Sequence, residues 1–244
     1  MCAFEKSTMD ESKFTAFLQP IVNAHTLTTE SYEVLSRTLT PINIEHFFKT
    51  SAPTTGAQVS LKVLKDTLQF FSSSPAKIQF NLTAPQLLLK STVDSLENVL
   101  ASNYPNTMLM CEITEFGYNI DGELRDIVTH LRAKGLSFSL DDFGTCQSGY
   151  DRLFDLPISQ VKVDRKFINN IVACRKQQTL IRHLVNYIPL FNNAQLIFEG
   201  VETQTQHNLL MEMGSEFHQG YFYARPAPLK DIRRTNSLAQ SRTN

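Results

Sequence analysis

Short runs rich in β-branched and aromatic residues recur along the chain, separated by longer stretches whose apolar residues repeat at helical spacing. We predict strands over 14–22, 32–37, 78–83, 108–114, 137–143, 160–167, 196–201 and 217–224. We predict helices over 59–71, 87–100, 122–134, 177–191 and 203–213. Gly135 and Gly214 follow two of these stretches, where a glycine typically ends a helix.

Eight strands that alternate with helices predict an α/β protein with a mostly parallel sheet. A closed, TIM-like (β/α)8 barrel fits this strand count best, and an open doubly wound sheet is the alternative that periodicity alone leaves open. We expect residues 13–230 to form one barrel domain. Residues 1–12 and 231–244 are polar, and we expect a flexible leader and a basic tail there.

The composition fits a globular enzyme or binding module. Of the 244 residues 42% are hydrophobic, which is enough for a substantial core. The 23 Lys and Arg balance 24 Asp and Glu, so the formal net charge is -1 and we expect no DNA or RNA polymer as a partner. No apolar run approaches the roughly 18 residues of a membrane span, so we expect no membrane contact either.

The cysteines and histidines bear on metal chemistry and compartment. Cys2, Cys111, Cys146 and Cys174 form no CxxC pair, and the six histidines form no HExxH motif. This pattern argues against a disulfide framework or a zinc site and favours a cytoplasmic location. A metal in this protein would therefore be held by oxygen ligands.

Acidic side chains gather at the carboxyl ends of predicted strands, where barrel active sites are built. The residues at these ends are Glu33, Asn81, Glu112, Asp141, Asp142 and Glu199. Carboxylates that close together repel one another unless divalent cations lie between them. An all-oxygen set favours Mg²⁺ or Mn²⁺, and thus metal-assisted phosphoryl chemistry. Because strand neighbours point to opposite faces, Asp141 and Asp142 share the site only if the strand ends there, as Gly144 suggests.

Eight motifs surround these residues: FLQPIV, YEVLSR, FNLT, CEITE, LDDFGT, VKVDRKF, FEGVE and HQGY. Their order and approximate spacing over about residues 14–228 resemble the EAL-domain cyclic-di-GMP phosphodiesterases. The resemblance implies a modified (β/α)8 barrel whose first strand runs antiparallel. It also implies hydrolysis of cyclic di-GMP to linear pGpG by a water that the metals activate.

The resemblance implies a role for each matching residue. The expected metal ligands are Glu33, Asn81, Glu112, Asp141, Asp142 and Glu199, around two Mg²⁺ or Mn²⁺ ions, with Asp142 at the second. Glu33 and Glu199 also count as catalytic, together with Lys162, which would orient and polarise the attacking water. The expected substrate-binding residues are Gln19, Arg37, Glu202 and Gln219, with Gln19 facing a guanine and Arg37 a phosphate. Glu115 would brace the loop after LDDFG.

The chain departs from the family pattern in that loop, which reads Thr145-Cys146-Gln147-Ser148-Gly149-Tyr150. The family usually has T-G-Y-S-S there, and the loop is associated with dimer contacts and with ordering the second metal. Cys146 lacks the freedom of glycine at positive φ. We therefore weigh an active, homodimeric bacterial phosphodiesterase, with the dimer formed through this loop, against a catalytically weak or silent module that binds cyclic di-GMP or a protein partner. Turnover of the nucleotide separates the two hypotheses.

Overall fold

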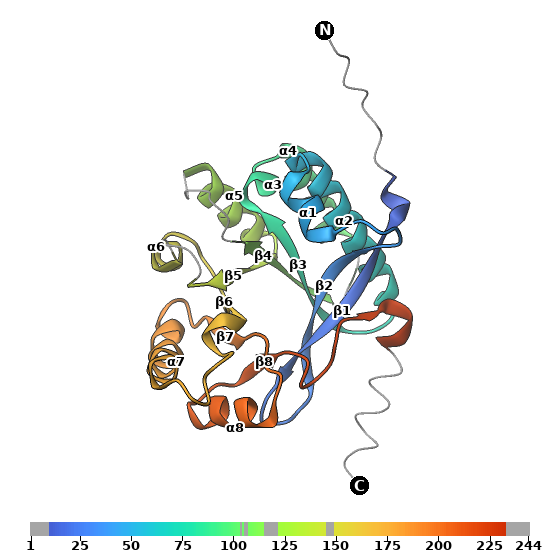
Figure 1. The fold of residues 1–244 in the computed structure, drawn as a ribbon. Helices are drawn as coiled ribbons and strands as arrows, with labels where there is room; N and C mark the ends of the chain where they lie inside the picture. Colours follow the sequence, from blue (N-terminus) through green and yellow to red (C-terminus); the bar gives the residue numbers. More distant parts are fainter. Residues whose placement is uncertain (1–9, 103, 105–106, 115–121, 145–148, 233–244) are drawn as a thin grey trace.

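The computed structural model describes residues 10–102, 104, 107–114, 122–144 and 149–232. In this part of the chain eight strands form a closed barrel with helices on its outside (Figure 1). The strands are β1 (Phe14–Asn23), β2 (Thr29–Thr38), β3 (Ala76–Thr83), β4 (Thr107–Thr114), β5 (Ser137–Phe143), β6 (Gln160–Val163), β7 (Gln195–Phe198) and β8 (Phe217–Gln219). A two-residue strand, β9 (Ala227–Pro228), adds to β1.

The first strand is the irregular one. β1 pairs antiparallel with both β2 and β8, whereas every pairing from β2 through to β8 is parallel. These two pairings of β1 join the ends of the sheet into a closed barrel. The modified barrel with an antiparallel first strand is thereby confirmed, and the open doubly wound sheet is excluded.

The helices lie between consecutive strands and cover the outside of the barrel (Figure 1). They are α1 (Ile44–Thr50), α2 (Pro53–Phe70), α3 (Ala84–Leu87), α4 (Lys90–Ala101), α5 (Gly122–Ala133), α6 (Gly149–Asp155), α7 (Arg175–Tyr187) and α8 (Gln204–Glu212). Short 3₁₀ turns occur at η1 (Glu11–Lys13), η2 (Arg165–Phe167) and η3 (Ile188–Leu190). No helix of the described residues is long and apolar enough to cross a membrane.

Three predicted strands end earlier than their apolar pattern suggested. The predicted strand 160–167 stops at Val163, because the Asp164 side chain accepts a hydrogen bond from Lys166 N and caps η2. The predicted strands 196–201 and 217–224 stop at Phe198 and Gln219, each just before a loop with a positive-φ glycine. The loops that follow these three strands also contain apolar and aromatic residues, so the apolar pattern overestimated the lengths of the strands.

The helix predictions need two corrections. The predicted helix 87–100 is two helices, α3 and α4, because Leu89 is in an extended conformation between them. Helices α1 and α6 were missed, since each has only seven residues and too few turns for a periodic pattern. Gly135 and Gly214 do follow helices at positive φ, as predicted. Most of the predicted leader and tail, residues 1–9 and 233–244, lies outside the described residues.

Alternation along the strands separates two environments. In β3, Ile78, Phe80 and Leu82 are almost fully buried in the hydrophobic core, which also includes residues of the surrounding helices. Between them, Gln79 and Asn81 bond to residues of other strands across the barrel interior. The interior of the barrel is therefore polar where the site residues lie.

Candidate active site

A single lysine lies at the centre of the acidic residues. Lys162 is the third residue of β6, and its side chain is 1% exposed. Its Nζ lies 2.7 Å from Glu199 Oε1, 2.9 Å from Glu112 Oε2, 3.1 Å from Glu33 Oε2 and 3.6 Å from Asp141 Oδ1. Burial lowers the pKa of this ammonium, but the four carboxylates outweigh burial and hold the pKa well above its usual range. Lys162 therefore stays charged at the centre of the site.

Two side-chain amides hold the carboxylate of Glu33 in place. Its Oε1 accepts a hydrogen bond from Asn81 Nδ2 at 2.9 Å, and its Oε2 accepts one from Gln219 Nε2 at 2.7 Å. Burial raises the pKa of Glu33, but Lys162 and these two amides together hold the pKa below its usual value. Glu33 is therefore ionised and fixed in orientation.

The other carboxylates carry more negative charge than one lysine offsets. Burial, followed by repulsion from Glu33, raises the pKa of Glu112 well above its usual range. Burial also raises the pKa of Asp141, and it raises that of Glu199 to about 8, with Asp141 and Glu33 adding to the Glu199 shift. Such a cluster either keeps protons or binds cations.

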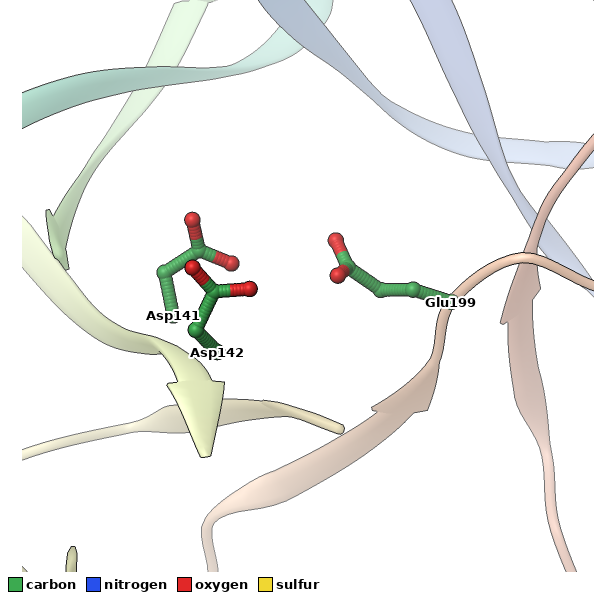
Figure 2. A group of neighbouring side chains, drawn as sticks. All are labelled: Asp141, Asp142 and Glu199. Carbon is green, nitrogen blue, oxygen red and sulfur yellow. The ribbon is translucent and has the colours of Figure 1, made fainter. Parts of the chain in front are cut away.

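A β-bulge brings the two neighbouring aspartates to one face. The β5–β6 register shifts between Leu140 and Phe143, and Asp142 has φ +55°. Asp141 and Asp142 both point across the barrel mouth toward Glu199, which follows β7 (Figure 2). One carboxylate oxygen from each of the three lies within 4.8 Å of the others. The strand ends at Phe143, just before Gly144, as expected, and the bulge within it lets both aspartates enter the site.

The donor set fits a divalent cation. Asn81 Oδ1 and Glu112 Oε1 are buried at the site, and neither has a hydrogen-bond partner among the residues that the structure describes. Unpaired buried oxygens are costly, and a cation would satisfy them. The oxygens of the six predicted ligands are the hard donors that Mg²⁺ or Mn²⁺ takes, and none of the six is a thiolate or an imidazole.

A pocket of about 190 Å³ opens beside these carboxylates. Three predicted substrate-binding residues, Gln19, Glu202 and Gln219, line it. Sequence reasoning did not assign six other lining residues: Leu35, Asp164, Arg165, Gly200, Gly220 and Tyr221. Strand alternation could have found two of them, since Leu35 lies two residues beyond Glu33 and Asp164 two beyond Lys162.

Two predicted roles find no support in the geometry. Arg37 lies near the end of β2 and does not line this pocket; its guanidinium is 5.9 Å from the Phe17 ring centroid and donates to Ser36 O. Glu115, the expected brace, lies outside the described residues, as does the segment 145–148 of the altered loop.

The fold and the site together define a class: a barrel with a candidate divalent-metal centre at the carboxyl ends of its strands. The family model of the EAL domain matches residues 4–226, nearly the whole chain. The chain belongs to the EAL-domain family.

Curated relatives agree with this assignment. The cyclic di-GMP phosphodiesterase RocR of Pseudomonas aeruginosa is 31% identical over 156 residues, which cover 63% of this chain and 40% of that protein. The probable cyclic di-GMP phosphodiesterase PdeD of Escherichia coli is 28% identical over 234 residues, 91% of this chain and 43% of that protein. The chain therefore spans about two fifths of the length of these relatives.

Solved structures show the same fold. The MucR phosphodiesterase in complex with c-di-GMP superposes with a TM-score of 0.77 at 28% identity, over 91% of this chain and 94% of that one. An EAL-domain protein from Listeria monocytogenes gives 0.79 at 24% identity, over 97% and 100%. The Klebsiella pneumoniae BlrP1 structure with manganese and cyclic di-GMP gives 0.78 at 22% identity, over 89% and 57%.

Proposed function

We propose that this protein is a metal-dependent phosphodiesterase that hydrolyses cyclic di-GMP to linear pGpG. The observation that carries the proposal is the buried contact of Lys162 with four carboxylates beside a pocket. Relatives named as cyclic di-GMP phosphodiesterases support the choice of substrate. The acidic set is complete despite the altered loop, which favours the enzyme over a silent binding module.

The proposed metal ligands are the six residues whose oxygens surround Lys162 and the β5 bulge: Glu33, Asn81, Glu112, Asp141, Asp142 and Glu199. We propose two Mg²⁺ or Mn²⁺ ions, since Asp142 and Asp164 extend the acidic set beyond the four carboxylates around Lys162. When bound, such ions lower the pKa of a water and offset charge on phosphoryl oxygens.

The chain's own residues orient the reactants. Lys162 Nζ would give up one of its three close carboxylate contacts to donate a hydrogen bond to the attacking water. The water gives up one proton as its oxygen forms a bond to phosphorus, the bond from phosphorus to the leaving ribose oxygen breaks, and the leaving oxygen takes up one proton, so the proton count balances. Gln19, Glu202 and Gln219 line the pocket and bind the nucleotide. Arg37 would reach a phosphate only after its side chain leaves the Phe17 ring.

We also propose an oligomeric state, a protein partner and a cellular compartment. A homodimer through the loop after Asp142 would order that edge of the site, and a protein partner could regulate it there. The cysteines favour the cytoplasm, since Cys111 and Cys174 are both free.

Incubation of purified protein with cyclic di-GMP and Mg²⁺ or Mn²⁺, followed by chromatography, tests the activity. We expect pGpG to accumulate, and EDTA to stop its formation. Tight nucleotide binding without product at high protein concentration would overturn the enzyme and leave a receptor. Sedimentation at high concentration tests the dimer, and a strict monomer would contradict it.

A further inference from the structure

A second polar layer lies inside the barrel, one step below the acidic residues. Its members are Ser31, Gln79, Ser139 and Gln160. Each precedes a site residue by two positions on its strand, before Glu33, Asn81, Asp141 and Lys162 respectively, so both layers face the barrel interior. All four are 0–4% exposed, in a position that barrels usually fill with branched aliphatic residues.

The two glutamines bind each other reciprocally. Gln160 Nε2 donates to Gln79 Oε1 at 2.6 Å, and Gln79 Nε2 donates to Gln160 Oε1 at 3.1 Å. Each Nε2 uses its second hydrogen on a serine: Gln79 on Ser31 Oγ at 2.8 Å, and Gln160 on Ser139 Oγ at 3.2 Å. Both amides therefore use all their donors, as a buried polar network requires.

This pair crosses the barrel. β3 and β6 are separated in the sheet by β4 and β5, so no backbone ladder joins them. The layer above repeats the same strand-to-strand pattern. Asn81 reaches from β3 to Glu33 on β2, and Lys162 reaches from β6 to Asp141 on β5. The glutamine pair thus links the two strands that carry Asn81 and Lys162.

We propose that Gln79 and Gln160 are positioning residues that act through Lys162. Their amide pair fixes β6, a strand of only four residues, against β3. The distance between β6 and β3 decides whether Lys162 Nζ reaches Glu33 and Glu112, which lie on the far side of β5. An apolar layer would fill the same space without a directional bond across the barrel. The kinetic consequence rests on the proposed function, whereas the position of Lys162 does not.

The test uses Gln79→Met, Gln160→Met and the double variant, because Met has a similar length and no amide. The control is Gln178→Met, which removes a hydrogen bond to Ile171 O on the outside of the barrel. Three properties are measured: kcat and KM for cyclic di-GMP, thermal stability, and the ¹⁵Nζ resonance of Lys162 in metal-free, lysine-labelled protein. Loss of that resonance in Lys162→Met assigns it.

We expect the double variant to lose tenfold to a hundredfold in kcat with KM within about twofold, since small misplacements of a reacting group cost this much. Its Lys162 resonance should shift or broaden. It should be at least as stable as either single variant, because no amide is left unpaired. The control should keep kcat and the resonance even if its stability falls.

A folded double variant with wild-type kcat and an unchanged Lys162 resonance would overturn the proposal. If the double variant does not fold, Gln160→Met decides by the same two readouts. If the wild-type protein shows no turnover, the proposed function fails, and the Lys162 resonance alone decides whether the amide pair positions the lysine.

Discussion

The buried ammonium of Lys162 holds the carboxylates of the site together. Four carboxylates from four other segments lie within 4.0 Å of its ammonium. A buried charge with so many partners is fixed in place, and removal of the charge would leave the carboxylates to repel one another.

Lys162→Met should therefore separate catalysis from metal binding. We expect kcat to fall at least a hundredfold, the usual size of such a loss, because the variant lacks the donor that we propose orients the water. Mn²⁺ affinity, measured by calorimetry, should not weaken, because the site becomes more negative. Lys134→Met, at an exposed lysine near Glu97, is the control and should leave kcat unchanged. Near-normal turnover by Lys162→Met would refute the role that we assign to this lysine.

Asp142 combines an unusual backbone conformation with a proposed role as a metal ligand. Its φ is +55°, a region that Asn and Asp adopt more readily than other residues with a Cβ. Burial, with repulsion from Asp141 and Asp164, raises its pKa to about 6. The side chain therefore lies where a second cation would relieve repulsion.

Two substitutions at Asp142 should distinguish these contributions. Asp142→Asn keeps a side chain suited to positive φ, so we expect weaker Mn²⁺ binding and lower turnover at nearly unchanged stability. Asp142→Ala should lose both metal affinity and about 1–2 kcal/mol of stability, since alanine is strained there. Calorimetry with Mn²⁺ and chemical denaturation measure the two effects. Equal stability of the two variants would contradict the backbone argument.

At the scale of elements, β8 and the turn after it are held by a chain of polar side chains. Ser215 Oγ lies 2.7 Å from His218 Nε2, and His218 Nδ1 lies 2.7 Å from Tyr223 Oη. Tyr223 Oη also lies 2.6 Å from His207 Nδ1, on α8. This chain fixes the segment that carries Gln219 and the other pocket residues.

Acid should weaken this network. Burial, with His207 and His25 nearby, lowers the pKa of His218 to about 3. An unfolded chain protonates histidine near pH 6.5, so the unfolded state binds more protons and folding is penalised as pH falls from about 6.5 toward 3. The penalty from His218 should reach about 2 kcal/mol at pH 5.

Denaturation of the wild-type protein and of His218→Gln at pH 7.5 and pH 5 measures this loss of stability from His218. Other groups titrate in both proteins, since Asp142 and Glu199 have raised pKa values that favour folding in acid. The difference between the two proteins removes those contributions. We expect the wild type to lose more stability than the variant between the two pH values, and equal losses would show that His218 is not held neutral.

At the scale of the whole molecule, closure of the barrel concentrates negative charge at one mouth. The net charge of the chain is only -1, yet four strands or the loops after them bring five carboxylates to this place. A ligand that binds only the folded state stabilises it, and a cation here would also relieve the repulsion.

Mn²⁺ or Mg²⁺ should therefore raise the melting temperature. At a cation concentration of a hundred times the dissociation constant, the free energy of unfolding rises by about 2.7 kcal/mol. For a chain of this size the melting temperature then rises by about 5–10 °C. EDTA should reverse it. Asp141→Asn/Asp142→Asn should lose most of the gain, whereas Asp94→Asn, at an exposed helix pair with Lys90, should keep it. An equal gain in all three proteins would place the cation elsewhere.

The sequence by itself determined the strand-end positions of the acids and the alternation of strands with helices, because these follow from patterns that are local along the chain. The antiparallel first strand was implied only by the family resemblance that the eight motifs carry. The sequence did not determine where β6 to β8 end, the short helices α1 and α6, or the pocket residues Tyr221 and Arg165, because these depend on loops whose conformation depends on their neighbours.

Only the tertiary structure decided how the acids meet. The bulge that brings Asp142 beside Asp141 is a mismatch between β5 and β6, and no pattern within either strand records it. The convergence on Lys162, and the glutamine pair beneath it, join strands that are distant in sequence and in the sheet. Periodicity shows which face a side chain takes, but its partner across a closed barrel is fixed only when the sheet closes.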